Sequence, residues 1–405
     1  MGMKCTSCKS QMEENIDNKD TPITKRTFKL LFPIGKGGFG KVWKVTHKQT
    51  STEYAMKEIS KVKLYINKSI PLINQELLTL KSIHNFFISN IHYAFQTEEY
   101  LYIITDYFPG GDLRYHINNR YPKRFTQNEI KFILGCIILA LVYLRKYNII
   151  HRDIKPDNLV FDSKGYLHLT DFGVSKRINN THHNIVDKSG TIGYASPEAV
   201  LGLKQSYTMD YFALGVIAYE LLVGCRPFRG RNKHQIKEQM ITKTVQLKPE
   251  DIVHCSSNDN KESEIICDFV NSLLQRKVHN RLGSQGIEDI IYHPFFDGFD
   301  WNALYNQQIV SPFQFREGEC YKNIELYNDV DNSNGILNTN EYYDILNRIN
   351  NNNKCFVKFY YDSRHKEHHV NKYNNLSTIY DYECFQKLKN TKRNSGVSLL
   401  STKSE

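Results

Sequence analysis

Cysteine, long apolar runs and acidic charge are all in short supply in this sequence. Nine cysteines occur in 405 residues, an odd number without regular spacing, which argues against a secreted disulfide scaffold. The longest apolar run, 132–144, lies between Lys131 and Arg145. It is shorter than the roughly 20 residues that a membrane-spanning helix needs, so we expect a buried core helix there. The first residues contain no apolar run, so we expect no secretory signal.

Acidic residues are outnumbered by basic ones. The chain has 43 Asp and Glu against 53 Lys and Arg, a net charge of +10. Such an excess suits phosphate-bearing ligands, nucleic acid or an anionic membrane surface, and does not choose among them. With 40% hydrophobic and 24% charged residues, the composition is that of a globular protein, and the length allows two or three units.

The apolar periodicity divides the chain into a β-rich part followed by a helical part, which predicts an α+β fold. The expected strands are 28–32, 42–45, 54–59 and 100–105, and the expected helices are 69–84, 127–147, 210–224, 232–242 and 261–275. Residues 1–27 are polar and predict a flexible leader. Residues 366–405 are polar and basic, and we expect them to be disordered.

Three glycines form the first candidate phosphate site. Gly35, Gly37 and Gly40 belong to a G-x-G-x-x-G-x-V pattern that ends at Val42. Glycine allows the backbone to approach phosphate oxygens closely. The alternative is a flexible hairpin turn without a ligand. A dinucleotide site of the Rossmann type needs a helix directly after the loop, whereas a strand pattern follows here, which favours a flap over ATP.

A lysine on the next predicted strand is the second candidate. Lys57 follows Ala55 and Met56 in an apolar context, where it needs a carboxylate to remain charged. Glu76, on the following predicted helix, is the natural partner. The pair would direct Lys57 at the α- and β-phosphates of a nucleotide. The alternative is a lysine on a solvated strand face.

The segment 151–173 carries the most specific pattern in the chain. It reads His151-Arg152-Asp153-Ile154-Lys155-Pro156-Asp157-Asn158 and continues to Thr170-Asp171-Phe172-Gly173. In order and spacing these motifs resemble those of eukaryotic serine/threonine protein kinases. The resemblance covers about 28–320 and implies a bilobal kinase fold. A β-rich N-lobe with the hinge would occupy 28–109, and a mainly helical C-lobe would occupy 110–299.

The chemistry of phosphoryl transfer explains these residue types. A metal-bound triphosphate needs hard oxygen ligands, so Asn158 and Asp171 are expected to bind Mg²⁺. The attacking hydroxyl needs an acceptor, Asp153, and the transferring group needs a cation, Lys155. We therefore expect ATP and Mg²⁺ as cofactors. The alternative is a pseudokinase scaffold without turnover, which the presence of all these residues disfavours.

The resemblance also implies a nucleotide pocket between the lobes. Thr105 falls at the gatekeeper position, Asp106 and Phe108 would offer backbone groups to adenine, and Asp112 would reach the ribose or a substrate. The implied ATP-binding set is Ile34, Gly35, Gly37, Gly40, Val42, Ala55, Lys57, Thr105, Asp106, Phe108, Asp112 and Val160.

Further positions match structural elements of the kinase family. Glu198 of Ser196-Pro197-Glu198 would pair with Arg281, with Ser196 in place of the family's alanine. Asp210 would tie the catalytic loop to the helix below it. The residues expected to form an apolar column between the lobes are Leu80, Ile91, His151 and Phe172.

Three features resemble the AGC group, whose members are similar to the cAMP-dependent kinase. They are the segments 109–113, 293–304 and 312–313. Residues 300–365 would then form a tail that returns to the N-lobe, and 356–361 resembles its hydrophobic F-x-x-F motif, with Tyr360 replacing a Ser or Thr. A random aromatic cluster is the alternative for that motif. The segment 110–116 is similar to the YANK branch.

Substrate and regulatory positions follow from the same resemblance. Asp112, Asp157 and Glu220 match acidic positions that read basic residues before the phosphoacceptor, the alternative being a solvated acidic face. Asp187 occupies the usual site of the activation-loop phosphothreonine, where its charge would pair with Arg152. Thr191 follows in the same loop. The alternative switch is Ser189 or Thr181.

The N-terminus fits an acylation pattern, with Gly2 as a myristoylation site and Cys5 and Cys8 as palmitoylation candidates. We therefore expect a cytoplasmic, peripheral membrane protein that acts on protein substrates, binds no nucleic acid and is monomeric. Cys5 and Cys8 lack the second pair that a zinc site needs. Residues 332–341 have calcium-loop spacing, but Val330 stands at the first ligand position. A calcium-regulated kinase remains the second alternative.

Overall fold

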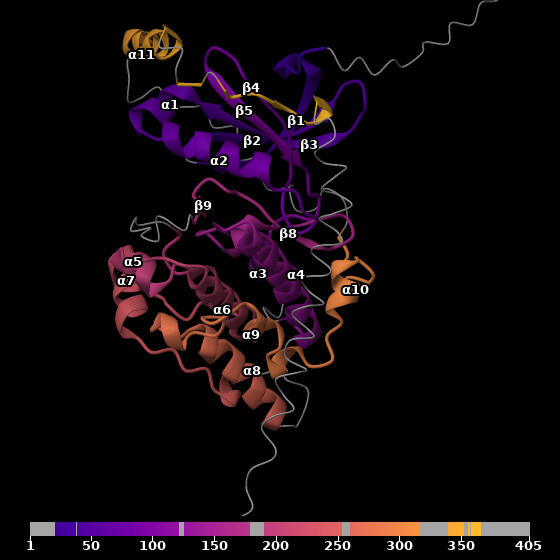
Figure 1. Cartoon of the computed structure of the whole chain (residues 1–405), viewed down its shortest axis with the longest axis vertical. Helices are drawn as coiled ribbons and strands as arrows, with labels where there is room; N and C mark the ends of the chain where they lie inside the picture. Colours follow the sequence, from indigo (N-terminus) through magenta and orange to yellow (C-terminus); the bar gives the residue numbers. More distant parts are fainter. Residues whose placement is uncertain are drawn as a thin grey trace, which may run out of the picture.

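The computed structural model describes residues 21–37, 39–120, 125–178, 190–252, 260–315, 339–351, 355–356 and 358–365. The chain folds into two lobes that stack along its long axis (Figure 1). The upper lobe is built on a sheet and carries two short helices, and the lower lobe is mainly helical. The predicted α+β class and bilobal arrangement are confirmed.

The small lobe contains a six-stranded antiparallel sheet in the order β1-β2-β3-β5-β4-β10. Its strands are β1 (Phe28–Gly37), β2 (Gly40–His47), β3 (Glu53–Ser60), β4 (Ile91–Gln96), β5 (Tyr100–Asp106) and β10 (Tyr361–Asp362). Four of these strands were predicted from the sequence. Strand β4 was not predicted. Neither was the short β10, which owes its conformation to pairing with β4, through Tyr361 opposite Ala94, rather than to a local pattern.

Two helices cover one face of this sheet, α1 (Lys61–Ile66) and α2 (Ile70–Ser82). The hydroxyl of Ser60 accepts a hydrogen bond from the Lys63 amide at the start of α1, an N-cap that predictions from apolar spacing overlook. In α2, Ile73, Leu77 and Leu80 are buried at helical spacing. Glu76 lies on the same buried face. A carboxylate is rarely buried unless it has a partner, so this position calls for a nearby cation.

The large lobe is formed by short strands and by helices of which α4, α6 and α8 are the longest. The strands are β6 (Ile149–Ile150), β7 (Leu159–Phe161), β8 (Leu167–Leu169) and β9 (Lys176–Arg177). The helices are α3 (Leu113–Asn119), α4 (Gln127–Lys146), α5 (Pro197–Leu201), α6 (Thr208–Val223), α7 (Lys233–Thr242), α8 (Asn260–Leu273), α9 (Glu288–Ile291) and α10 (Trp301–Tyr305). The two ladders pair β6 with β9 and β7 with β8.

Helix α4 contains the apolar run noted in the sequence. It begins with a capping box, in which Thr126 and Glu129 satisfy each other's backbone amides. Its length and hydropathy would suffice to cross a membrane, yet most of it lies inside the large lobe. The expectation of a buried core helix is therefore confirmed.

The small lobe begins earlier in the chain than the sequence predicted. We expected a flexible leader over 1–27, but residues 21–27 are part of the described fold. Ile23 is buried, and the ammonium of Lys25 lies 2.9 Å from the Glu58 carboxylate. A single apolar residue among polar ones gives no periodic signal, so the boundary at Phe28 was placed too late.

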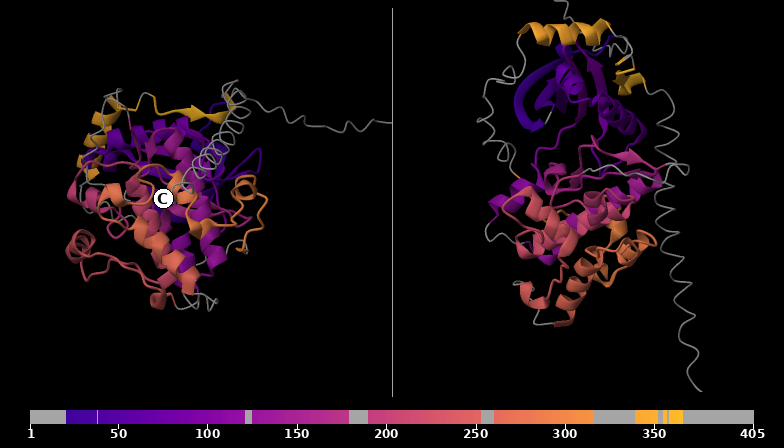
Figure 2. Two further views of the ribbon diagram at one scale, coloured as in Figure 1. Left: turned by 60° about the horizontal axis from the view of Figure 1, so that its bottom comes forward. Right: turned by 90° about the vertical axis from the view of Figure 1, so that its left-hand side faces the viewer.

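The C-terminal part of the chain returns to the small lobe, as Figure 2 shows for α11 (Thr339–Asn351), which lies across its top. Phe356 and Phe359 are buried against the small lobe, and the Gln96 amide donates a hydrogen bond of 3.0 Å to the Phe356 carbonyl. The F-x-x-F segment is thus a docked element rather than a random aromatic cluster.

Candidate active site

The glycine-rich segment connects β1 and β2 as a hairpin over the cleft. Gly35 pairs with Val42, and Gly37 pairs with Gly40. A Cβ at Gly40 would lie 1.7 Å from the Glu58 carbonyl oxygen, so this position cannot carry a side chain. Around Gly35 and Gly37 a Cβ would meet no atom closer than 3.7 Å. Their lack of side chains is therefore not required by packing and fits close approach of a ligand.

Lys57 lies on β3 and connects the two lobes. Its ammonium is 2.7 Å from Glu76 Oε1 and 3.2 Å from Asp171 Oδ1. Burial disfavours the charged lysine, but the carboxylates of Asp171 and Glu76 outweigh this and raise the pKa of Lys57. The charge of Lys57 in turn lowers the pKa of Asp171 to about 2. The site therefore presents a fixed cation and an ionised carboxylate at neutral pH.

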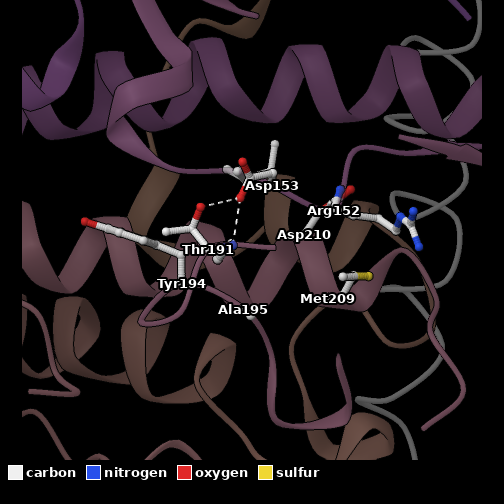
Figure 3. Close-up of a pocket in the computed structure, with 9 residues that line it drawn as sticks. Arg152, Asp153, Thr191, Tyr194, Ala195, Met209 and Asp210 are labelled. Atoms are coloured by element: carbon white, nitrogen blue, oxygen red, sulfur yellow. Dashed lines mark hydrogen bonds between the residues drawn. The ribbon is translucent and has the colours of Figure 1, made fainter. Parts of the chain in front are cut away.

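The catalytic-loop residues are held around Asp153. One carboxylate oxygen accepts hydrogen bonds from the Thr191 amide at 2.8 Å and hydroxyl at 2.7 Å, as Figure 3 shows. The other accepts bonds from Lys155 Nζ at 2.8 Å and Asn158 Nδ2 at 3.2 Å. Lys155 also donates to the Thr191 hydroxyl at 2.8 Å. The predicted residues Asp153, Lys155, Asn158 and Thr191 thus form one network.

Asp210 supports this loop from below, as predicted. Its carboxylate accepts hydrogen bonds from the His151 amide at 2.8 Å and the Arg152 amide at 2.9 Å. Burial raises the pKa of Asp210 to about 7. Arg152 has a φ of 71° and Asp171 a φ of 58°, conformations that cost energy in residues other than glycine. The two Asp210 hydrogen bonds hold the strained Arg152 in place.

The apolar column between the lobes is assembled. Leu80, Ile91, His151 and Phe172 are all buried, and the rings of His151 and Phe172 lie 5.1 Å apart. Lys57 adds a polar link between the lobes, because it binds both Glu76 of α2 and Asp171.

The predicted nucleotide-binding residues lie on adjoining strands. Thr105 is opposite Ala55 in the β3–β5 ladder, and Val42 is opposite Lys57 in the β2–β3 ladder. Asp112 forms a bridge with Val160. The Asp106 amide donates to the Asn90 carbonyl at 3.1 Å, and Asp106 is opposite Tyr54 at the end of the β3–β5 ladder.

The residues predicted to bind metal, Asn158 and Asp171, come from neighbouring segments. The Thr170 amide donates to the Asn158 carbonyl at 2.9 Å, which places Asp171 beside Asn158. An amide oxygen and an ionised carboxylate fit Mg²⁺, which usually takes one or two protein ligands and completes its shell with phosphates and water. In the described part of the chain, no group of three His, Cys, Asp or Glu side chains forms another metal site.

The expected ion pair below the activation segment is present. Arg281 binds Glu198 through two hydrogen bonds of 2.6 and 2.9 Å, and both side chains are buried. The hydroxyl of Ser196, which stands where kinases have alanine, is buried and has no hydrogen-bond partner within the described ranges.

The three acidic substrate positions have different surroundings. Asp157 has an exposed side chain, Asp112 caps α3 through the Tyr115 amide at 2.7 Å, and Glu220 is buried. Arg114, a residue that sequence reasoning missed, binds Glu220 at 2.9 Å. No local sequence pattern links Arg114 to Glu220, so the sequence offered no signal for this pair.

Several predicted residues lie outside the described residues. They are Gly2, Cys5, Cys8 and Asp187, together with the alternative switch residues Thr181 and Ser189 and most of the calcium-like segment. Arg152, the predicted partner of Asp187, does lie in the described part of the chain, and its Nε donates to the Val174 carbonyl at 2.6 Å.

The two-lobed fold, the lysine–glutamate pair across the cleft and the Asp153 network define the class of a protein kinase. The family model of the protein kinase domain matches residues 28–296, and the chain belongs to this family. It is similar to the serine/threonine-protein kinase sgk-1 of Caenorhabditis elegans, with 35% identity over 308 residues, 74% of this chain and 63% of that protein.

Two other relatives give the same result. Protein kinase 2 of Dictyostelium discoideum is 33% identical over 303 residues, 75% of this chain and 60% of that protein. Ribosomal protein S6 kinase 2 beta of Xenopus laevis is 35% identical over 293 residues, 71% of this chain and 44% of that protein. The chain therefore spans less than two thirds of the length of these relatives. The resemblance to AGC-group kinases stated above is confirmed.

Proposed function

We propose that this protein transfers the γ-phosphoryl group of MgATP to serine or threonine hydroxyls of proteins. The observation that carries the proposal is the complete set of polar contacts around the cleft. Lys57 faces Glu76 and Asp171, and Asp153 is bound by Lys155 and Thr191. A pseudokinase would be expected to lack one of these groups, and none is missing here.

Each residue has a defined task in this reaction. MgATP supplies the transferring group, and Asp171 and Asn158 would hold its metal. Lys57 would bind the α- and β-phosphates, and Lys155 would stabilise charge on the transferring group. Asp153 would accept the hydroxyl proton of the substrate. Because phosphoryl transfer asks for positioning and electrostatics rather than covalent chemistry, this fixed arrangement supports catalysis.

Phosphorylation of an arrayed serine and threonine peptide library by the full chain tests this proposal. We expect MgATP-dependent incorporation that disappears in an Asp153→Asn variant. Parent-like incorporation in that variant would contradict the role of Asp153, and a folded parent protein without incorporation on any peptide would contradict the proposal as a whole.

We further propose that Asp187 replaces the activating phosphothreonine. A phosphate brings about −1.5 to −2 charges, whereas aspartate brings one, so the loop would be held without modification but less firmly. The support is the register of Asp187 and the presence of Arg152. Protein made without other kinases should then be active, and Asp187→Ala should lose most of that activity. An inert unmodified protein, or full activity in Asp187→Ala, would refute this.

The remaining proposals concern substrate and location. The negative charge at Asp157 and Asp112 favours a basic residue before the acceptor.

At the N-terminus, myristate on Gly2 with palmitate on Cys5 or Cys8 would hold the protein on a membrane, because one acyl chain alone binds only marginally. Gly2→Ala should then move the protein to the soluble fraction, and its persistence on membranes would exclude acylation as the anchor. We propose a monomer with no nucleic-acid partner.

A further inference from the structure

Helix α3 carries an arginine that enters the acidic group expected to read the substrate. Arg114 Nη1 lies 2.9 Å from Glu220 Oε1, and Nη2 lies 3.2 Å from Glu220 Oε2. Nη2 also donates to the Tyr194 hydroxyl, and Tyr194 donates to Glu220. The third nitrogen, Nε, lies 3.6 Å from Asp157 Oδ2. Arg114 therefore contacts two of the three acidic positions at once.

The depth of these groups shows which carboxylate is occupied. The Glu220 side chain is 5% exposed, Arg114 is 23% exposed and Asp157 is 51% exposed. Arg114 thus lies between the buried carboxylate and the exposed one. Parallel hydrogen bonds between a guanidinium and a carboxylate are the strong geometry for this ion pair. A substrate arginine would compete with Arg114 for the same two Glu220 oxygens, which already accept three hydrogen bonds from Arg114 and Tyr194.

A second cation strengthens this effect. Arg226 lies with its guanidinium carbon 5.7 Å from the Tyr194 ring centre, and Arg114 lies 5.8 Å from the same centre. An incoming basic side chain would therefore meet the charge of Arg114 at Glu220 and that of Arg226 beside the Tyr194 ring. Asp157 remains exposed, and Asp112 is engaged in capping α3.

We propose that Arg114 is a specificity-determining residue: it fills, from within the chain, the basic-residue subsite formed by Glu220 and Asp157. The inference deepens the proposed kinase function and rests on it. One position before the acceptor would face this subsite. The preferred substrates of the protein then show no selection for arginine at that position. Asp157, at the outer edge, is left to favour basic residues at another position.

Measurements of kcat/KM on serine peptides test this proposal, with MgATP and the full chain. Arginine replaces alanine at each of the five positions before the serine, one at a time. The variants are Arg114→Ala, Arg114→Ala with Glu220→Gln, and Arg120→Gln as a matched control. Arg120 lies at the other end of α3 and binds Glu129, outside the acidic group.

At the position read by this subsite, the parent should prefer arginine over alanine by less than about threefold in kcat/KM. The Arg114→Ala variant should prefer arginine there by about tenfold or more, because a buried carboxylate left unpaired discriminates strongly. The double variant should lose this gain, and Arg120→Gln should match the parent. A folded Arg114→Ala protein that changes turnover equally on all peptides would overturn the proposal and leave Arg114 a structural tie.

The parent protein alone provides a test that does not depend on the folding of a variant. Arginine selection of about tenfold or more at three of the five positions would overturn the proposal, because Asp157 and Asp112 account for at most two of them and Glu220 would then accept a substrate cation with Arg114 in place. Failure of the kinase proposal is distinct from either result, since no peptide would then be phosphorylated at all.

Discussion

Two ion pairs of similar composition, one in each lobe, differ in what surrounds the cation. Lys57 binds the buried Glu76 in the small lobe, and Arg281 binds the buried Glu198 in the large lobe. The Lys57 side chain is 33% exposed and also faces Asp171, whereas Arg281 is 0% exposed and donates further bonds to the carbonyls of Thr208 and Gln275. The first cation can still receive a phosphate, and the second is saturated by the protein.

This difference separates a functional pair from a structural one. In a buried pair whose groups bond only to the protein, each charge compensates the other. Removing one partner therefore leaves an unpaired buried charge, which destabilises the fold. In a pair whose cation is partly exposed, the cation can also attract an anionic ligand. The Arg114–Glu220 pair lies between these two cases, because Glu220 is buried and Arg114 is partly exposed.

The largest expected effect is on the closed pair. Arg281→Met should lower the free energy of unfolding by about 3–5 kcal/mol, because it leaves Glu198 buried and unpaired. Chemical denaturation measures this change. Combining it with Glu198→Leu should restore most of the loss, since both charges are then removed. A single variant as stable as the parent would show that Glu198 does not depend on Arg281.

The open pair should respond in catalysis instead. Lys57→Arg keeps the charge but changes the donor geometry, so kcat should fall about 10²–10³-fold, the range seen when one preorganised donor is lost. Unfolding free energy should change much less than in Arg281→Met. Steady-state kinetics and denaturation on the same preparation measure both quantities. A variant that is unstable but fully active would reverse the assignment of the two pairs.

Acid should weaken the contact between Lys57 and Asp171. The charge of Lys57 lowers the pKa of Asp171 to about 2. A carboxyl group with a depressed pKa stabilises the folded state above its unfolded pKa of about 3.9, and this contribution is lost as the pH falls through the folded value. The stability of the parent should therefore fall more steeply than that of Asp171→Asn below pH of about 4. Parallel curves there would show that Lys57 does not stabilise the Asp171 carboxylate.

The smallest effect is expected beside the closed pair. The Ser196 hydroxyl is buried without a partner in the part of the chain that the structure describes. Ser196→Ala should raise the free energy of unfolding by about 1 kcal/mol, since an unsatisfied buried hydroxyl costs that order of energy. A clear loss of stability in thermal unfolding would mean that the hydroxyl does have a partner, such as a bound water.

The sequence predicted the residues of the Asp153 network better than the edges of the fold. Asp153, Lys155, Asn158 and Asp171 were proposed from the specific spacing of their motifs, and the structure joins the first three by hydrogen bonds and places Asp171 beside Lys57. The helix α2 and its Glu76 were found from apolar spacing with one charged exception. These features are local in sequence, and a single pattern reports each of them.

What the sequence did not predict depends on contacts between distant segments. Strand β10 exists because Tyr361 and Asp362 pair with β4, more than 260 residues earlier in the chain. Arg114 was missed because its partner Glu220 lies on α6 and no local pattern links them. The acidic positions were predicted as residues that read the substrate, and that role stays a prediction. The occupation of Glu220 by a cation of the same chain is a property of the folded state.

The most direct test of the account is to measure nucleotide binding and turnover on the same preparations of the parent, Asp153→Asn and Asp171→Asn. The account predicts that Asp153→Asn binds MgATP like the parent but loses turnover by about 10²–10⁴-fold, the usual contribution of a positioned base. Asp171→Asn should lose the magnesium-dependent part of nucleotide binding. Parent-like turnover in both variants would contradict the assignment of the Asp153 network as the catalytic site.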